Sequence, residues 1–589
     1  MRILFSTVLL LLAFNVCSQE IDYRLSMPEP HTHYYEVTII LKQTNLDYLD
    51  LYMPVWTPGS YKVRDFSKNV ENLFATSNNL NLTIKKLSKN TWRVQTPQKS
   101  EVRITYKVYA YENSVRTSFL DMSHGYVNGA SVFMTIKGLE SLPIQLTIEP
   151  FRNWKKVSTS LTQGKKLAYK ATNYDELIDS PIEIGNHSSY YFEEDGVKYE
   201  IAFYGQTEAD TAQIFRGIQK IVKTTNSMMS EVPLKKYVFI IQNLTIGSGG
   251  LEHSNSTMIQ MNRWTYENPI NFYGLVAHEY FHLWNAKRIR PLELSSFNYH
   301  SENYSKHLWL MEGFTSYYEN LILMKADMMD LQTFLNKTAS TINYIESQPG
   351  VKVQSISESS FDAWIKFYQP NENSSNSSVS YYSKGKIVAL LLDLFIIDAS
   401  KGERNLDDLL TLLYQEFYIS RASGYTEEEL INSCSDIAGK DMKPFFEDYV
   451  YGLETPDYQR YFKSVGIKAT LNEAINADFG AATTLSNGKL KITSVTREGS
   501  AYESGLNVND EIIAIDGYRI LKNELSIVLN SRKIGDRVSI LIARDGLIKE
   551  IQVELLKSTT KRLNLSFRNS IIKEEKQNFG TWIRLNDER

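Results

Sequence analysis

The spacing of apolar residues changes twice along this 589-residue chain, and each change restricts the fold. From residue 19 to about residue 191 apolar and polar residues alternate, as in half-buried antiparallel strands. Around residue 208 the period becomes helical, apart from a strand-like run at 235–242, and it stays helical to about residue 451; short strand-like runs return from about 466 to 556. A chain of this length needs more than one hydrophobic core. The predicted fold class is therefore multidomain α+β, with an all-β amino-terminal domain, a mainly helical middle domain and a small β-rich carboxy-terminal domain.

Neither end of the chain fits these three domains. Residues 1–18 combine a basic Arg2 with an apolar run from Ile3 to Phe14, which predicts a signal peptide cleaved after Ser18. No other apolar run is long enough for a membrane helix. We therefore expect a protein exported to the periplasm or beyond the cell, without a stable membrane anchor. Residues 559–589 are polar and carry no strong signal, so we expect a carboxy-terminal tail there.

Charge and cysteine content exclude some classes of protein. The chain has 64 Lys and Arg against 68 Asp and Glu, a net charge of -4, which provides no basic surface for nucleic acid. After cleavage of the signal peptide Cys434 is the only cysteine, so no intramolecular disulfide can form. Apolar cores must therefore supply the stability of each domain.

The segment 275–291, LVAHEYFHLWNAKRIRP, predicts a metal site. On a helix His278 and His282 lie on one face, so both imidazoles can bind the same ion. Glu279 lies about 100° around the helix, where it can accept a proton from the attacking water without binding the metal. The apolar flanks indicate a buried helix, in which two unpaired imidazoles would need partners.

A catalytic zinc site needs a third protein ligand downstream of the two histidines. Glu312 lies in a second apolar helical stretch, LWLMEGFTSYYEN, and is the predicted ligand. Glu319, two turns further on, suits a hydrogen bond that orients a histidine. Glu302 and the histidines His300 and His307 are alternatives without a comparable context.

Several linked motifs resemble one known family. The segments GGLEH (249–253), HEYFHLWNAKRIRP, LWLMEGFTSYYE, SFDAWIKFYQPNENS and SYYSKGKIVALLLD resemble the glycyl aminopeptidase family of zinc metallopeptidases, in the gluzincin clan, and more distantly the aminopeptidase N family. Upstream, MPVWTPGSYKVRDFSKNV resembles the β-rich amino-terminal domain of this family. The resemblance implies domains at 19–191 (β-rich), 192–460 (a thermolysin-like zinc peptidase domain) and 465–558 (a PDZ domain).

The resemblance also implies roles that spacing alone does not supply. One zinc ion would be held by His278, His282 and Glu312. Glu252, beside Gly249 and Gly250, would bind the free α-amine of a peptide substrate. Tyr382 would donate a hydrogen bond to the oxyanion of the transition state, although its neighbour Tyr381 is easily confused with it.

Two questions about the surroundings of the site remain open. Thermolysin-like enzymes often carry an acid four residues after the glutamate ligand, where this chain has Ser316, so Glu319 is the substitute expected near His278. The basic run Lys287, Arg288 and Arg290 either faces the carboxylate side of the peptide or forms a solvated or salt-bridged surface.

The stretch ITSVTREGSAYESGLNVNDEIIAIDGYRI has the element order of a PDZ domain. Such domains add an extended peptide to a sheet edge and bind its terminal carboxylate with backbone amides. The carboxylate-binding loop is expected near Asp478–Ala482, DFGAA, and the ligand would be a carboxy-terminal peptide. The alternative is a PDZ fold that only packs against the catalytic domain.

The function implied is a zinc-dependent aminopeptidase, and the family name suggests Gly or Ala as the first residue. One alternative is a zinc endopeptidase on the same scaffold, in which Glu252 binds no amine. The other is a non-catalytic PDZ-containing peptide-binding protein. Blocking the amino terminus of the substrate separates the first two.

Overall fold

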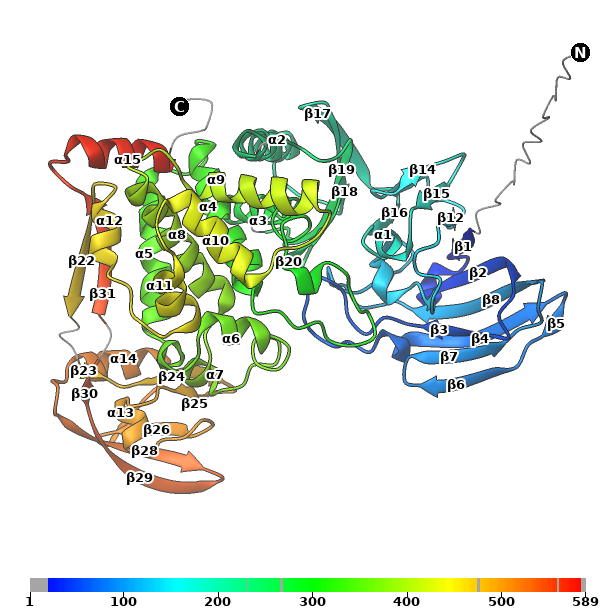
Figure 1. Cartoon of the computed structure of the whole chain (residues 1–589). Coiled ribbons are helices and arrows are strands. Elements are labelled where there is room, and N and C mark those ends of the chain that lie inside the picture. Colours follow the sequence, from blue (N-terminus) through cyan, green and yellow to red (C-terminus); the bar gives the residue numbers. More distant parts are fainter. Residues whose placement is uncertain (1–19, 230, 265–268, 474–476, 559–560, 584–589) are drawn as a thin grey trace, which may run out of the picture. The chain divides into compact units, whose positions relative to one another are not determined.

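The computed structural model describes residues 20–229, 231–264, 269–473, 477–558 and 561–583. The predicted signal peptide, 1–18, lies outside them. The contacts divide the chain into two compact units (Figure 1). The first unit comprises Met1–Pro54, Asp65–Glu112 and Thr117–Asn186; the second comprises Val55–Arg64, Asn113–Arg116 and His187–Arg589. The second unit thus includes two short segments from within the predicted amino-terminal domain.

The first unit is built from three sheets, as the period of two predicts (blue and cyan in Figure 1). Its largest sheet has the order β14 (Thr162–Gln163), β15 (Ala168–Ala171), β12 (Ile144–Glu149), β1 (Ile21–Ser26), β2 (Tyr34–Thr44), β8 (Ser100–Tyr109), β4 (Val70–Ser77), β5 (Leu80–Asn81). The second has β13 (Lys156–Ser158), β16 (Ile182–Gly185), β10 (His124–Val127), β9 (Phe119–Leu120), and the third β11 (Thr135–Ile136), β3 (Tyr48–Tyr52), β7 (Thr91–Gln95), β6 (Ile84–Ser88). One short helix, α1 (Tyr174–Ile178), joins β15 to β16.

The alternating pattern correctly predicts which side chains of this unit are buried in its core. In β8 the side chains of Val102, Ile104, Tyr106 and Val108 are buried, and the residues between them are not. Because successive side chains of a strand point to opposite faces, one face of β8 packs against the core. The amino-terminal all-β prediction is confirmed.

A five-stranded sheet opens the peptidase part of the second unit. Its order is β17 (Ser188–Glu194), β18 (Val197–Tyr204), β19 (Lys236–Leu244), β21 (Ser256–Asn262) and β20 (Gly249–His253). The strand β20 therefore lies at an edge and carries the GGLEH motif. Among the described strands it pairs with β21 only, antiparallel, with Gly249 opposite Gln260 and Glu252 opposite Thr257. An edge strand keeps backbone groups available for another chain.

Helices form the rest of this part, as the change of period predicts (green to yellow in Figure 1). The longer ones are α2 (Thr211–Met228), α3 (Ile270–Phe281), α4 (Thr315–Lys325), α5 (Leu331–Glu346), α8 (Tyr381–Ala399), α9 (Leu406–Leu413) and α10 (Glu427–Ala438). Shorter ones are α6 (Ile356–Phe361), α7 (Ser374–Ser377), α11 (Lys443–Phe446) and α12 (Tyr458–Lys463), with π-helical segments η6 (Trp309–Phe314), η8 (Tyr414–Ser420) and η9 (Glu447–Tyr451). One apolar cluster runs through the sheet and these helices.

The predicted PDZ region has its own smaller core. Its sheet has the order β24 (Ala481–Ser486), β25 (Lys489–Val495), β26 (Glu511–Ile515), β28 (Arg537–Arg544), β29 (Leu547–Glu554), and β27 (Tyr518–Arg519) pairs with β26. Two helices, α13 (Ser500–Glu503) and α14 (Lys522–Asn530), accompany it, and β23 (Ala477–Asp478) pairs with β30 (Leu556–Lys557).

The chain after Ser558 is not the tail that its polarity predicts. The strand β31 (Lys561–Phe567) pairs antiparallel with β22 (Ile467–Glu473), and the helix α15 (Lys573–Ile583) follows. Ile467, Leu563 and Trp582 belong to the peptidase core and not to the PDZ core. The PDZ domain is thus flanked on both sides by strands of the peptidase, and the expected boundaries at 465 and 558 need this correction.

Trp582 anchors this returning segment in the peptidase core. Its side chain is fully buried, and its indole N–H donates to the hydroxyl of Tyr317 at 2.8 Å. Tyr317 in turn donates to Asp393 of α8 at 2.6 Å. The helix was not predicted from the sequence, because its only large apolar residues stand among polar ones: Phe579, Trp582 and Ile583.

One asparagine ties the PDZ sheet to the peptidase helices. The side-chain amide of Asn376, in α7, donates to the carbonyl of Val495 at 2.7 Å, and its oxygen accepts from the backbone N–H of Arg497 at 2.8 Å. Asn376 is itself buried. Because the carboxamide pairs with a donor and an acceptor on one strand end, it fixes the register of this contact.

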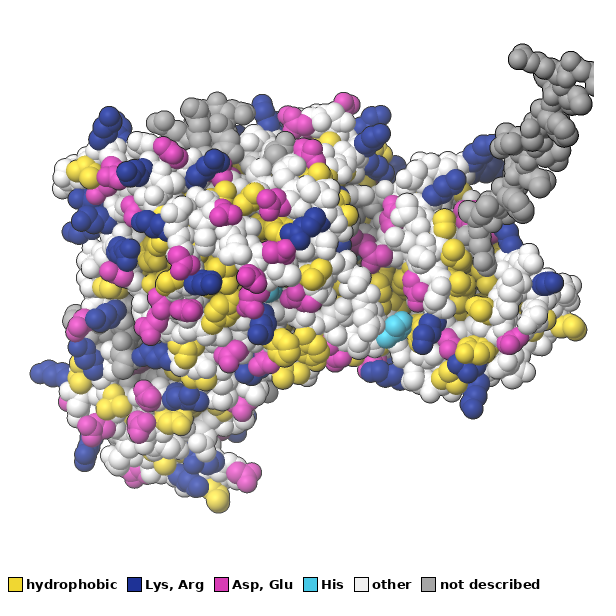
Figure 2. Space-filling model, in the orientation of Figure 1, with side chains coloured by type: hydrophobic (Ala, Val, Ile, Leu, Met, Phe, Trp, Pro, Cys, Tyr) yellow, Lys and Arg dark blue, Asp and Glu magenta, His cyan; other side chains and the backbone are white. Residues whose placement is uncertain are grey.

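Acidic and basic side chains are interspersed on the face shown in Figure 2, in line with the small net charge. In the described part of the chain no helix is both long and apolar enough to cross a membrane. Cys434 is buried and forms no disulfide.

Candidate active site

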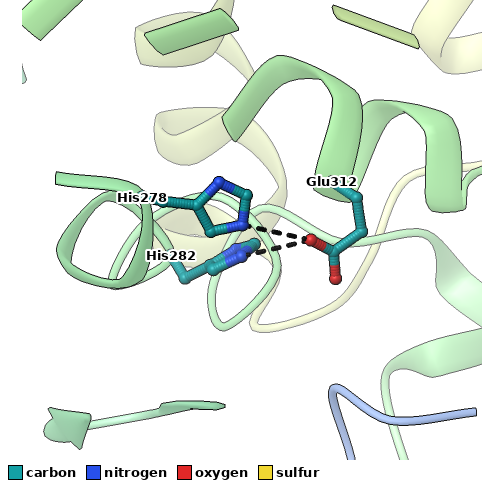
Figure 3. A group of neighbouring side chains, drawn as sticks. All are labelled: His278, His282 and Glu312. Carbon is teal, nitrogen blue, oxygen red and sulfur yellow. Dashed lines mark ion pairs between the residues drawn. The ribbon is translucent and has the colours of Figure 1, made fainter. Parts of the chain in front are cut away.

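Three predicted ligands meet between α3 and η6. The Nε2 atoms of His278 and His282 point at the same carboxylate oxygen, Oε2 of Glu312, from 3.4 and 3.3 Å (Figure 3). His278 lies in α3 and His282 caps its carboxyl end, while Glu312 lies in η6. All three side chains are buried. Because the two histidines are four residues apart, the helix presents both rings on the same side.

This geometry fits a tetrahedral zinc ion. Zinc bonds to nitrogen and carboxylate oxygen are about 2.0–2.2 Å long, so tetrahedral donors lie roughly 3.3–3.6 Å apart. The two measured separations to Glu312 fall in this range, and the three donor atoms all lie within 4.8 Å of one another. Two imidazoles and one carboxylate are also a common donor set for catalytic zinc, which keeps a fourth position open.

The second nitrogen of each imidazole has a partner of its own. The Nδ1 atom of His278 lies 3.3 Å from Oε2 of Glu319, and Nδ1 of His282 lies 2.9 Å from the carbonyl of Asn285. Such bonds hold the rings with Nε2 toward the metal position. Glu319 also lies 3.5 Å from Nζ of Lys386. The structure therefore places Glu319 where it was expected, beside His278.

Asn285 joins the two ligand-bearing helices, and sequence reasoning missed it. Its fully buried amide nitrogen donates to the carbonyls of Leu310 and Met311, at 3.0 and 2.9 Å, and to the hydroxyl of Thr315 at 3.0 Å. Glu312 follows these carbonyls directly. Asn285 thus fixes η6 against the end of α3. Its position three residues after His282 was the available signal.

Glu279 lies next to the strand that carries the GGLEH motif. A methyl group built on Gly250 would overlap the Glu279 carboxyl group, so the backbone of β20 passes directly over it. One carboxylate oxygen, Oε2, is buried and has no hydrogen-bond partner among the described residues. A buried acceptor of this kind needs a further donor, such as a water molecule.

Glu252, which lies on β20, belongs to the same group of buried side chains as Glu279. Carboxylate oxygens of Glu252 and Glu279 and a ring nitrogen of His282 lie within 4.8 Å of one another. A methyl group built on Gly59 would lie 2.5 Å from Oε2 of Glu252, so the WTPGS segment covers this carboxylate. Gly59 has a φ of +82°, a conformation that suits glycine. Sequence reasoning assigned this segment to the amino-terminal domain and missed its place at the site.

Of the two neighbouring tyrosines, Tyr382 is the one with a ring contact to a metal ligand. The Tyr382 ring lies nearly parallel to His278 with centroids 6.4 Å apart, and it stacks on Phe367 at 5.2 Å. Tyr381 is fully buried and packs on Phe367 from 4.9 Å. Burial, followed by the charge of Glu312, raises the pKa of Tyr382 well above its usual value, so the phenol remains a donor.

Two glycines bring Tyr382 close to Glu312. A methyl group on Gly313 would lie 2.5 Å from Cα of Gly385, and one on Gly385 would lie 2.6 Å from the carbonyl oxygen of Trp309. The η6 segment and α8 therefore touch backbone to backbone. This contact explains why a glycine follows the tyrosine by three residues in the YSKG sequence.

The buried charged groups of the site shift one another's pKa values. Burial opposes ionisation of Glu312, but His282 and His278 hold its pKa at about 2. Burial also disfavours the charged form of His278, yet Glu312 and Glu319 raise the pKa of that ring well above its usual value. Burial raises the pKa of Glu279 to about 7, and the two histidines oppose the shift. Glu279 thus has the affinity for a proton that a general base needs near neutral pH.

The other sequence candidates have different roles. His307 pairs with Glu293 at 3.2 Å, and neither His300 nor Glu302 belongs to the metal-binding groups found among the described residues. Arg288 is buried and donates to the carbonyls of Leu283 and Ser254 at 2.7 and 3.0 Å. It fastens the turn after β20 to the end of α3. Arg288 therefore has a structural role and fits neither of the two expectations for the basic run, a solvated surface or a contact with the peptide.

Three family models match the chain. They are the Peptidase M61 N-terminal domain over residues 22–186, M61 glycyl aminopeptidase over 271–388 and a PDZ domain over 477–555. No curated protein sequence matches.

Solved structures resemble most of the chain. An aminopeptidase N family protein from Idiomarina loihiensis is 31% identical, with a TM-score of 0.88, over 96% of this chain and 100% of that one. The M1 zinc metallopeptidase from Deinococcus radiodurans shares the fold at 13% identity, with a TM-score of 0.50, over 74% of this chain and 95% of that one. The chain thus belongs to the M61 glycyl aminopeptidase family and is a zinc metallopeptidase, an aminopeptidase with a carboxy-terminal PDZ domain.

Proposed function

We propose that the chain removes the amino-terminal residue of peptides with one zinc ion held by His278, His282 and Glu312. The observation that carries this proposal is the carboxylate of Glu252, which belongs to the same buried group as Glu279 and His282. A carboxylate at this distance from the reacting groups binds a substrate ammonium and so places the first peptide bond at the metal. An endopeptidase has no use for it there.

Glu279 acts as the general base in this proposal. When bound, zinc lowers the pKa of water and polarises the substrate carbonyl. Glu279 takes the proton from the attacking water and returns it to the leaving amine. Its buried, unpartnered oxygen beside the two histidines supports both steps.

Tyr382 donates a hydrogen bond to the oxygen that becomes negative in the transition state. Donors aimed at such an oxygen are worth about 3–4 kcal/mol in other hydrolases. The ring position beside His278 and the raised pKa of the phenol support this role. Glu319 orients His278, and the backbone of Gly249 and Gly250 provides an edge along which an extended substrate can lie.

The first residue of the substrate is proposed to be small, Gly or Ala. Tyr61 is buried close enough to Glu312 and Glu252 for both carboxylates to raise its pKa further, after the effect of burial. Tyr368 lies 6.4 Å from the Tyr61 ring, and its hydroxyl is 3.4 Å from the carbonyl of Gly59. These aromatic rings restrict the space beside the proposed amine site.

The test compares Ala-Ala-Ala with acetyl-Ala-Ala-Ala, each with and without a zinc chelator. We expect cleavage of the free peptide only, abolished by the chelator and restored by zinc. Glu279→Gln should retain about one zinc per chain and lose at least about 100-fold in kcat. Cleavage of the acetylated peptide at an equal rate would favour an endopeptidase, and an unchanged rate in Glu279→Gln would exclude this mechanism.

We also propose that residues 1–18 direct export and are removed after Ser18. The support is the sequence pattern alone. Amino-terminal sequencing of the protein from its native cells, together with cell fractionation, tests this. We expect Gln19 at the amino terminus and the enzyme outside the cytoplasm.

The PDZ domain is proposed to bind carboxy-terminal peptides along β24. This strand lies at the end of its sheet, and the backbone of Phe479 and Gly480 precedes it. Fluorescence anisotropy with peptides that differ only in a free or amidated carboxy terminus tests the proposal. A domain that only packs on the peptidase would bind neither.

A further inference from the structure

Arg116 has an unusual position for a residue of the amino-terminal third of the chain. It belongs to the short segment Asn113–Arg116, which folds with the peptidase unit. The side chain of Asn113 accepts a hydrogen bond of 2.7 Å from Gln260, the residue directly opposite Gly249 in the β20–β21 ladder. The segment is thereby fixed beside Gly249.

The Arg116 side chain reaches the substrate-facing strand. A methyl group built on Gly249 would have Nη1 of Arg116, at 4.0 Å, as the only neighbouring atom within that distance. The guanidinium Nε is buried and has no hydrogen-bond partner among the described residues, and no described ion pair involves Arg116. Arg116 as a whole is only partly buried, and its charge has no partner among the described ion pairs, so an anionic ligand can pair with it.

The order of residues along β20 says which part of a peptide would lie there. Glu252 marks the proposed amine end, Gly250 passes over Glu279 at the scissile bond, and Gly249 follows on the leaving-group side. Extended chains rise about 3.4 Å per residue, so Gly249 lies about 10 Å from Glu252 along the strand. The α-carboxylate of an extended tripeptide lies at about the same distance from its amine.

We propose that Arg116 binds the α-carboxylate of short peptides, and that the enzyme prefers tripeptides with a free carboxy terminus. The two Nη groups of a guanidinium, of which Nη1 is the one nearest Gly249, form a planar fork that can pair with both oxygens of a carboxylate. Glu252 would bind the amino end of the substrate and Arg116 its carboxylate, so the distance between them would select the length of the peptide. The inference rests on the proposed role of Glu252.

The experiment compares kcat/KM for Ala-Ala-Ala and Ala-Ala-Ala-amide in the full-length zinc-loaded enzyme. A charge-assisted pair predicts about a 10- to 100-fold preference for the free acid, expressed mainly in KM. Arg116→Gln should lower this ratio to nearly one, and Arg116→Lys should keep part of it. Arg216→Gln, on the exposed side of α2, is the matched control and should keep the full ratio.

The outcomes separate this inference from the proposed function. Equal rates on acid and amide in the wild type would overturn the role of Arg116 and leave the aminopeptidase mechanism intact. An equal loss on both substrates in Arg116→Gln, with an unchanged melting temperature, would also overturn it, because the side chain would then act on the site as a whole. Cleavage of neither peptide by the wild type would contradict the proposed function itself.

Discussion

Gly250 of β20 lies so close to Glu279 of α3 that a methyl group on Gly250 would occupy the place of the carboxyl group. The edge strand and the proposed general base are therefore in direct contact. A substrate that adds to this strand has its backbone next to the group that takes the proton.

Gly250→Ala should displace Glu279 while leaving the metal ligands in place. We expect kcat to fall by about 100-fold, the usual worth of a general base, with the zinc content unchanged. Steady-state kinetics and metal analysis measure the two effects. Gly274→Ala on α3 is the control, because its methyl group meets only Leu323 at 3.9 Å. Full activity in Gly250→Ala would show that the contact is irrelevant.

Asn285→Ala should weaken the metal site without touching a ligand. The change removes three hydrogen bonds between the end of α3 and the segment that carries Glu312. Loss of a supporting partner typically costs 10- to 100-fold in metal affinity, and we expect about that. Competition with a chromogenic chelator measures it. Asn336→Ala, exposed on α5, should bind zinc as the wild type does.

Asp393 should make stability depend on pH. Burial raises its pKa to about 6, so between its unfolded value and pH 6 the folded protein binds more protons than the unfolded chain. The folded state therefore loses stability as the pH rises through this window, by about 3 kcal/mol for two pKa units. Asp393→Asn cannot titrate, and its melting temperature relative to the wild type should rise from pH 4 to pH 7. Parallel melting curves would contradict this.

Trp582→Ala should destabilise the peptidase, although residue 582 lies beyond the PDZ domain. The side chain is fully buried and bonded to Tyr317, and removing such a side chain costs about 3–5 kcal/mol. Urea unfolding monitored by circular dichroism measures the loss. Ile572→Ala, with 61% of its side chain exposed, should change stability by less than about 0.5 kcal/mol. A loose tail would make both variants neutral.

The parts of the site that the sequence predicts are those set by local geometry. His278 and His282 follow from the helical period, and the strands of the first unit follow from alternation. Glu252 and Tyr382 were reached through resemblance, because a lone glutamate or tyrosine has no local signal. Glu312 was one of several acids until the structure placed its oxygen beside both rings.

The missed parts depend on contacts between distant segments. Gly59 meets Glu252 across nearly two hundred residues, and Arg116 lies beside Gly249 across more than one hundred. No periodicity encodes such pairs. The helix α15 was missed for a different reason, since its few apolar residues stand in a polar sequence and gain their burial only from the core they complete.

The pairing of β22 with β31 has a consequence for how the protein is made. The peptidase core contains Leu563 and Trp582, so it cannot close while residues 561–583 are still inside the ribosome. The PDZ domain, with a core of its own, can fold earlier in synthesis than the enzyme that precedes it. Activity should therefore emerge only after residues 561–583 have left the ribosome, however early the zinc ligands are translated.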